Sequence, residues 1–289
     1  MNMILRIVGY IVLAPIIGGL LEGIDRKISA KMQRRVGPPI LQPFYDVKKL
    51  FNKQVILVSR SQTFALISYL ALMILTGAMF YAGMDILMCF FVMSTAATAL
   101  YFAAMVTSSP YATMGANREL IQMMAYEPAV LLSCVGFYLA EGTFNVNEIA
   151  GSGKLDIIFL PGFFVAFVFI LTIKMRKSPF DIATSHHMHQ ELVKGLTTEM
   201  GARNLAIFQV TEWYENVFLM GVVGLFFING SYISVIYAIV AILLVYFLEI
   251  LIDNTSARMK WENMLKITWI VTLFTAGVNL LVLMLVRVA

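Results

Sequence analysis

Charged residues are scarce in this chain. Only 13% of its 289 residues are Asp, Glu, Lys or Arg, 60% are hydrophobic, and the mean hydropathy is +0.82. A soluble domain carries about 25% charged residues. The composition therefore excludes an ordinary soluble enzyme and predicts an integral membrane protein.

Cysteine is also rare, and this limits the chemistry that the chain can carry by itself. Its two cysteines, Cys89 and Cys134, both lie in apolar runs. An iron–sulfur cluster takes four ligands, so we interpret both thiols as small core residues. The basic residues are spread over four loops and form no pattern typical of nucleic-acid binding. We expect no cofactor, no metal and no catalytic residue in this chain.

Long apolar runs make up most of the chain. In lipid, every backbone amide must be satisfied within its own segment, so runs of about 20 apolar residues predict helices. The first run lacks a small-residue cleavage site, which favours a true span over a signal peptide. We predict an all-α, polytopic membrane bundle and a single integral membrane domain over residues 1–289. Its eight spans are expected at about 3–24, 62–82, 84–107, 118–140, 157–176, 205–228, 231–252 and 265–287.

Lysine and arginine gather on one side of these spans. All but three of the 21 basic residues fall in or beside the connections at about 25–61, 108–117, 174–204 and 253–264. Cytoplasmic loops carry an excess of Lys and Arg. We therefore predict that these loops face the cytoplasm of a prokaryotic cell and that both termini lie outside. The exceptions are Arg6, Lys154 and Arg287.

The first basic loop contains a predicted surface helix. Gly37-Pro38-Pro39 prevents a helix at its start. After Pro43, apolar residues recur at helical spacing, which predicts a short amphipathic helix along the membrane surface. It is either a solvated face that fixes orientation or a rim for a docked soluble partner. The apolar residues are Phe44, Val47, Leu50 and Phe51.

The fourth predicted span carries carboxyl groups. Glu119, Gln122 and Tyr126 share one helix face. Glu127 adjoins them about 13 Å beyond Arg118, near mid-membrane. A lipid-facing carboxyl there costs at least about 2.5–3.5 kcal/mol. We predict that Glu127 faces the protein interior on a proton or ion path; the alternative is a structural carboxyl satisfied by a neighbouring hydroxyl.

The sixth predicted span carries Glu212 and Glu215 one turn apart on one side of the helix. Two neighbouring carboxylates repel, so at least one should hold its proton near neutral pH. Such a pair can pass a proton or respond to charge on a nearby redox centre. Trp213 and Tyr214, between them, are interpreted as interfacial anchors.

Ordered motifs occupy two of the basic loops. Arg-Val-Gly-Pro, Leu-Gln-Pro and Asp-x-x-Lys follow one another over residues 35–49. Residues 178–199 contain Ser-Pro-Phe-Asp, Glu-Leu-Val-x-Gly and Thr-Glu. Together with the acids of the fourth and sixth spans, this order resembles the membrane subunit called H in bacterial complex I over nearly the whole chain. The resemblance implies a proton or ion path, and the residues expected on it are Glu119, Glu127, Glu191, Glu199, Glu212 and Glu215.

Two departures indicate a branch of that family. Gln33-Arg34-Arg35 stands where complex I typically has Gly-Pro-Asn, and Ser185-His186-His187-Met188-His189-Gln190 replaces an acidic run. Both features resemble the Ech-type energy-converting hydrogenases. That resemblance implies a [NiFe] hydrogenase large subunit, a small iron–sulfur subunit and an antiporter-like membrane subunit as partners, with ferredoxin as electron donor. The nickel–iron centre and the iron–sulfur clusters would then reside in the partners.

The histidines have an alternative role of their own. Spacings of three and four residues could gather metal ligands on one helical turn, but no convincing fourth ligand is near. We expect the imidazoles to hydrogen-bond to the soluble arm or to relay protons beside it. The expected interface to that arm comprises Arg34, Arg35, Asp181, His186, His187 and His189. Two other functions stay open: the quinone-site subunit of complex I and a passive anchor for a redox arm.

Overall fold

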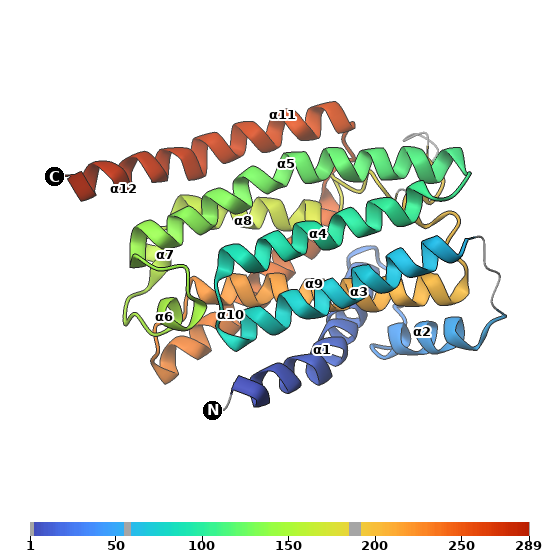
Figure 1. Cartoon of the computed structure of the whole chain (residues 1–289), viewed down its shortest axis with the longest axis horizontal. Coiled ribbons are helices and arrows are strands. Elements are labelled where there is room, and N and C mark those ends of the chain that lie inside the picture. The colour runs from blue at the N-terminus through green and yellow to red at the C-terminus, as the bar shows by residue number, and fades with distance from the viewer. Residues whose placement is uncertain (1–2, 55–58, 185–191, 289) are drawn as a thin grey trace.

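Helices account for nearly all of the computed structural model, which describes residues 3–54, 59–184 and 192–288 and has no strand within them (Figure 1). The long helices lie side by side, and the shorter ones cover their ends. The elements are α1 Met3–Met32, α2 Gln42–Asn52, α3 Arg60–Ala82, α4 Ile86–Met105, α5 Pro110–Glu141, α6 Val146–Ala150, α7 Asp156–Phe159, α8 Pro161–Lys174, η2 Gly195–Thr197, α9 Ala202–Leu225, α10 Tyr232–Thr255, α11 Trp261–Thr272, the π-helical turn η3 Leu273–Gly277 and α12 Val278–Val288.

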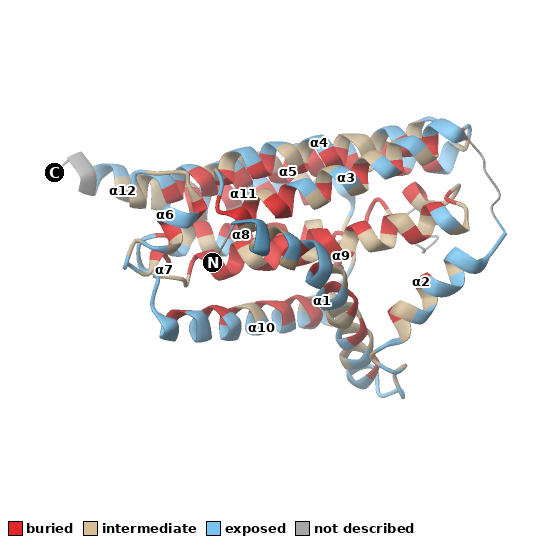
Figure 2. Cartoon of the chain, turned by 60° about the horizontal axis from the view of Figure 1, so that its bottom comes forward, coloured by how far each residue is buried: buried red, intermediate tan, exposed pale blue. Residues whose placement is uncertain are grey.

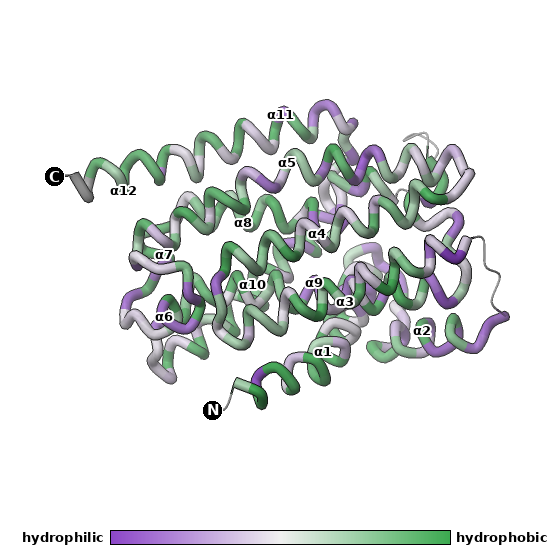
Figure 3. Tube along the Cα trace, in the orientation of Figure 1, coloured by the Kyte–Doolittle hydropathy of each residue, from purple (hydrophilic) through white to green (hydrophobic). Residues whose placement is uncertain are grey.

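Six helices in the described ranges are long and apolar enough to cross a membrane: α1, α3, α4, α5, α10 and the continuous run from Trp261 to Leu285. This confirms the all-α, multi-pass prediction. Apolar residues run along the rods, and polar ones concentrate towards the bundle ends (Figure 3). α8 is shorter, with 14 residues, and α9 carries Glu212 and Glu215. The predicted count of eight spans therefore remains a prediction.

The core lies where α3, α4, α5, α8 and α9 meet. Large side chains fill it without exposure, among them Phe163, Phe167 and Phe218. α10 lies at the periphery, where it buries one face and exposes the other (Figure 2). α11 likewise buries Met264 and exposes Trp269. Exposed apolar residues such as Leu244 and Phe274 are expected on helices that face lipid.

A close helix crossing places α1 against α9. A Cβ on Gly18 would lie 2.7 Å from the backbone oxygen of Trp213, so only glycine allows this approach. Nearby, the ring of Tyr10 lies 5.7 Å from that of Tyr214, whose hydroxyl donates a 2.8 Å hydrogen bond to the carbonyl of Ile11. The crossing fixes the side of α9 from which Glu212 and Glu215 project.

The helix predicted after Pro43 is present as α2, and its place along the membrane surface stays a prediction. Pro43 lies in its first turn, where its missing N–H leaves no helical hydrogen bond unmade. Val47 is buried, and the ring of Phe44 lies 5.3 Å from that of Trp213. α2 therefore docks through its apolar face onto α9, and the Gly37-Pro38-Pro39 stretch before it is not helical.

The connection from α8 to α9 folds back onto α5. Gly195 adopts φ +45°, and a Cβ there would lie 1.9 Å from the carbonyl oxygen of Ala183. Gly115 of α5 lies on the other side of this contact, and a Cβ there would lie 2.5 Å from the backbone nitrogen of Leu196. This end of the connection is thereby held against the helix that carries Glu119.

Candidate functional site

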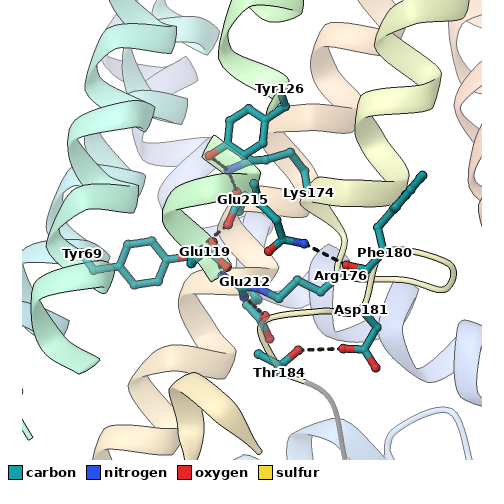
Figure 4. A network of polar contacts seen from close by, with 11 residues as sticks. Tyr69, Glu119, Tyr126, Lys174, Arg176, Phe180, Asp181, Thr184, Glu212 and Glu215 are labelled. Atoms are coloured by element: carbon teal, nitrogen blue, oxygen red, sulfur yellow. Dashed lines mark hydrogen bonds and ion pairs between the residues drawn. The ribbon is translucent and has the colours of Figure 1, made fainter. Parts of the chain in front are cut away.

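A short basic segment at the end of α8 is the centre of the candidate site. It contains Lys174, Arg176 and Lys177, and each of these cations is paired with a carboxylate of another helix. Because α8 ends in the bundle, the three side chains spread in different directions. Figure 4 shows the first two of these side chains with their partners.

Lys174 and Glu215 form the most enclosed pair. Lys174 Nζ lies 2.5 Å from Glu215 Oε1, and the side chains are each only 6% exposed. The Tyr69 hydroxyl donates a 3.0 Å hydrogen bond to the second carboxylate oxygen. Lys174 Nζ also lies 3.3 Å from the Tyr126 hydroxyl oxygen. Each charge is therefore satisfied without water, as a buried pair requires.

Arg176 connects two helices. Its guanidinium forms an ion pair with Glu212 of α9, and its Nη2 lies 3.1 Å from Glu119 Oε1 of α5. Burial alone would lower the pKa of Arg176, but Glu119 and then Glu212 raise it well above its usual value. The Glu119 side chain is 7% exposed and that of Glu212 32% exposed. Glu212 is thus the member of the group that is open to the surroundings.

Backbone and side-chain contacts hold the segment after Arg176 in place. Gln122 of α5 donates a 2.8 Å hydrogen bond to the carbonyl of Phe180. Next along the chain, Asp181 accepts a 3.1 Å hydrogen bond from Thr184, and Arg258 Nη2 lies 3.7 Å from its carboxylate. These contacts tie the segment that contains the predicted interface residue Asp181 to α5 and to the connection between α10 and α11.

A second polar chain extends from α9 towards α2. Trp213 Nε1 donates a 2.5 Å hydrogen bond to Glu22 of α1, and Glu22 pairs with Arg26 at 2.5 Å. Arg26 in turn pairs with Asp46 of α2 at 2.7 Å. Trp213 therefore does more than anchor the chain at an interface, because its indole N–H links the acid-bearing helix to the surface helix.

The structure brings together three of the six predicted path residues, namely Glu119, Glu212 and Glu215. Glu127 is half-buried and lies outside this network, and Glu199 is half-buried just after η2. Both roles stay predictions.

The predicted interface residues divide in the same way. Arg34 and Arg35 are exposed just after α1, and Asp181 has the contacts described above. The remaining four predictions, Glu191 and the histidines His186, His187 and His189, lie outside the described residues.

Sequence reasoning missed the cations that neutralise the acids. Lys174 and Arg176 enter the sequence-based prediction only through the orientation of the basic loops, and Tyr69 has no place in it. The signal was present in the sequence, because two basic residues follow an apolar helix at a spacing of two. The spacing of Glu212 and Glu215 predicted their mutual repulsion, but it could not show that each carboxylate pairs with a separate cation.

The charge balance of this cluster determines what it can do. Three carboxylates, those of Glu119, Glu212 and Glu215, face two cations, Lys174 and Arg176. Burial disfavours a net charge, so a single additional proton makes the cluster neutral. The arrangement can thus hold one proton and release it when a nearby charge changes.

The fold and this site define a class: a multi-pass membrane protein whose helices enclose a carboxylate–cation cluster. The model of the family described as NADH dehydrogenase matches residues 5–284, and the chain belongs to that family.

Two curated relatives show the range of similar proteins. The H subunit of the NADH-quinone oxidoreductase of Rhodospirillum rubrum is 25% identical over 293 residues, covering 89% of this chain and 86% of the relative. Hydrogenase-4 component C of Escherichia coli is 27% identical over 276 residues, covering 87% of each.

The fold is also found in a solved structure. A chain in the structure of the membrane-bound sulfane sulfur reductase, an archaeal respiratory membrane complex, superposes with a TM-score of 0.88. The two chains are 24% identical, and the match covers 98% of this chain and 100% of that one. This likeness shows that both chains share one fold.

Proposed function

We propose that this chain is the membrane-anchor and ion-path subunit of an energy-converting [NiFe] hydrogenase. In this proposal it couples ferredoxin-driven hydrogen evolution to translocation of protons or sodium ions. One observation carries the proposal: Glu119, Glu212 and Glu215 converge from two helices on the cations at the foot of the α8–α9 connection. Membrane helices keep ionisable groups in such positions chiefly for ion paths and proton relays.

The position of the cluster suggests how electron transfer is coupled to it. Arg176 and Phe180 are joined by three residues, and the connection continues past Asp181 into the region that resembles the docking loop of the complex I relatives. A partner docked on this connection would bind only a few residues after Arg176, whose guanidinium pairs with Glu119 and Glu212. A nearby charge shifts the pKa of an acid by about 1–3 units, which is sufficient to bind or release a proton.

The hydrogenase branch is supported by sequence. The chain is similar to hydrogenase-4 component C over 87% of its length. The histidine-containing stretch between Asp181 and Glu191 resembles the Ech-type subunits in the same way. On this proposal the partners are a [NiFe] large subunit, a small iron–sulfur subunit and an antiporter-like subunit. The basic loops then face the cytoplasm, and both termini lie outside the cell membrane.

Glu212→Gln, in the intact complex, tests the ion path. The amide keeps the shape of the side chain but cannot bind a proton. We expect redox-driven ion uptake into proteoliposomes to fall at least tenfold, while hydrogen evolution by the detergent-solubilised complex is retained. Glu262→Gln, an exposed acid at the start of α11, is the matched control. Unchanged uptake in Glu212→Gln would refute the role of the cluster.

A second function is favoured by the similarity to the NADH-quinone oxidoreductase relative. In that case the same acids would respond to quinone reduction in a complex I-like assembly. The two functions differ in the metal content of the soluble subunits that co-purify with this chain. Nickel together with iron, and hydrogen evolution from reduced ferredoxin, support the hydrogenase; iron without nickel, with quinone reduction, supports the second function.

A third possibility is that the chain is only a passive anchor. It can be distinguished from the two ion-path functions by neutralising a carboxyl group that lies far from the docked arm. The half-buried Glu127 is suitable, because it lies nearly in the middle of the 32-residue helix α5. An anchor tolerates Glu127→Gln with full ion uptake, whereas an ion path that includes this residue loses uptake.

A further inference from the structure

A second buried carboxyl, outside the Arg176 cluster, lies on α10. Glu249 is 0% exposed, and neither of its carboxyl oxygens has a hydrogen-bond partner among the described residues. It lies six residues before the end of α10, so about 9 Å from that end. A buried carboxyl without partners is costly, and a purely structural residue at this position could be apolar.

The third cation of the basic segment, Lys177, lies near this carboxyl without a hydrogen bond to it. Lys177 and then Asp253 are the charged groups that act on Glu249. Lys177 Nζ lies 2.8 Å from Asp25 Oδ2 of α1 and 5.1 Å from the centre of the Tyr246 ring. The Lys177 side chain is 7% exposed and that of Asp25 20% exposed. Lys177 is therefore enclosed between carboxyl groups of two helices.

The other helices that contact α10 bring their charges elsewhere. The Lys174 ammonium at the end of α8 is engaged by Glu215. Glu212 of α9 is engaged by Arg176. On α1, Glu22 pairs with Arg26. Lys177, Asp25 and Asp253 thus remain as the groups with which Glu249 can exchange a proton.

A polar cavity gives this group access to water. It has a volume of about 910 Å³ and opens at the end of α1 and α10, where the basic loops lie. Asp25 and Asp253 both line it, and the backbone N–H of Ser178, another lining residue, donates a 2.8 Å hydrogen bond to Asp253. One side of the Lys177–Asp25 pair therefore faces the cavity, and the other faces the buried Glu249.

We propose that Glu249 is a proton-loading site, supplied from this cavity through Asp25 and Lys177. Asp25 takes a proton from cavity water. The Lys177 ammonium swings towards Glu249, with which it has no hydrogen bond in the structure, and gives a proton to its carboxylate. The neutral Lys177 amine then takes a proton from Asp25, so its charge is restored once both transfers are complete. This inference rests on the proposed function, since it places a proton entry beside the Arg176 cluster and on the same basic segment.

The test uses the intact complex with Glu249→Gln. Infrared difference spectra between acidic and alkaline pH should contain a protonated-carboxyl C=O band in the wild type that Glu249→Gln lacks and the control Glu262→Gln retains. Redox-driven ion uptake into proteoliposomes should fall at least tenfold in Glu249→Gln and stay within twofold in Glu262→Gln. A retained band, or unchanged uptake, would overturn the inference.

Lys177→Arg provides a second, independent test if Glu249→Gln does not assemble. Arginine keeps the ion pair with Asp25, but it is not deprotonated in proteins, so it cannot hand on a proton. We expect the same loss of uptake with normal assembly, and normal uptake would overturn the relay. Glu212→Gln is measured in parallel. If it abolishes uptake while Glu249→Gln and Lys177→Arg do not, only this inference fails; if Glu212→Gln also leaves uptake intact, the proposed function fails.

Discussion

Lys174 and Glu215 are joined at 2.5 Å inside the helix bundle, and only 6% of either side chain is exposed. Lys174 ends α8, and Glu215 lies near the middle of α9, so the pair joins two helices that are separate in sequence. Because both charged groups are enclosed, water cannot take the place of either partner when that partner is removed.

Removing one partner of this pair should therefore destabilise the protein. We expect Lys174→Met to lower the free energy of unfolding by about 3–5 kcal/mol, since it leaves the Glu215 carboxylate buried and unpaired. The double variant Lys174→Met/Glu215→Gln should recover most of that loss. Thermal unfolding of the solubilised complex measures both, and equal losses in the single and double variants would contradict a direct pairing.

Arg176 should not tolerate lysine. Its guanidinium contacts Glu119 and Glu212 at the same time, whereas a lysine ammonium cannot present a planar fork to two carboxylates. A hydrogen bond to a charged group contributes about 1.5–3 kcal/mol, so Arg176→Lys should lower coupled ion uptake by about 10- to 100-fold. Uptake by proteoliposomes at saturating electron donor measures this. A loss smaller than threefold would show that the bridge does not matter for coupling.

The contact between α1 and α9 should be sensitive to a single methyl group. A Cβ at Gly18 would lie 2.6–2.8 Å from atoms of Trp213, most of them backbone. We expect Gly18→Ala to cost about 1–3 kcal/mol, as overpacked cores do. Gly9→Ala on the same helix is the matched control, because a Cβ there meets nothing within 4 Å. The unfolding temperatures of the two variants measure the difference, and similar values would contradict the close crossing.

Asp156 should make stability depend on pH. It lies at the start of α7, is 0% exposed, and neighbours the carboxyl group of Glu141. Burial and then the neighbouring Glu141 raise the pKa of Asp156 to about 8. The folded protein therefore holds this proton up to that pH, whereas the unfolded chain releases it near its ordinary pKa of about 3.9.

The sign of the effect follows from that difference. Between about pH 4 and pH 8 the folded state binds one more proton than the unfolded state, so stability falls as pH rises and levels off above pH 8. Asp156→Asn should flatten this part of the curve of unfolding temperature against pH. Glu148→Gln, an exposed acid in α6, should leave it unchanged. A wild-type curve that rises over this range would contradict the assignment.

The sequence predicted the helices well because apolar length and helical spacing determine them locally. It placed Glu119, Gln122 and Tyr126 on one face, and all three are buried on the inner side of α5. The helix that contains Val47 was predicted from the same periodicity, although its packing onto α9 was not. These features depend only on residues that are neighbours along the chain.

Features that depend on the packing of distant segments could not be read in this way. The pairing of Arg176 with Glu119 joins residues 57 positions apart, and no local pattern indicates it. The number of spans is open for a different reason: α8 has only 14 residues, and the 24-residue α9 carries Glu212 and Glu215 within it. The burial of Glu249 could not be predicted either, because a single acid in an otherwise apolar run has no periodic pattern.

The four-residue segment from Lys174 to Lys177 forms ion pairs with carboxylates from α1, α5 and α9. This segment therefore joins three helices through ion pairs. A movement of the connecting loop that displaces this segment should therefore affect all of its ion pairs together. Any displacement of this segment is consequently expected to change the electrostatic environment of all three helices together.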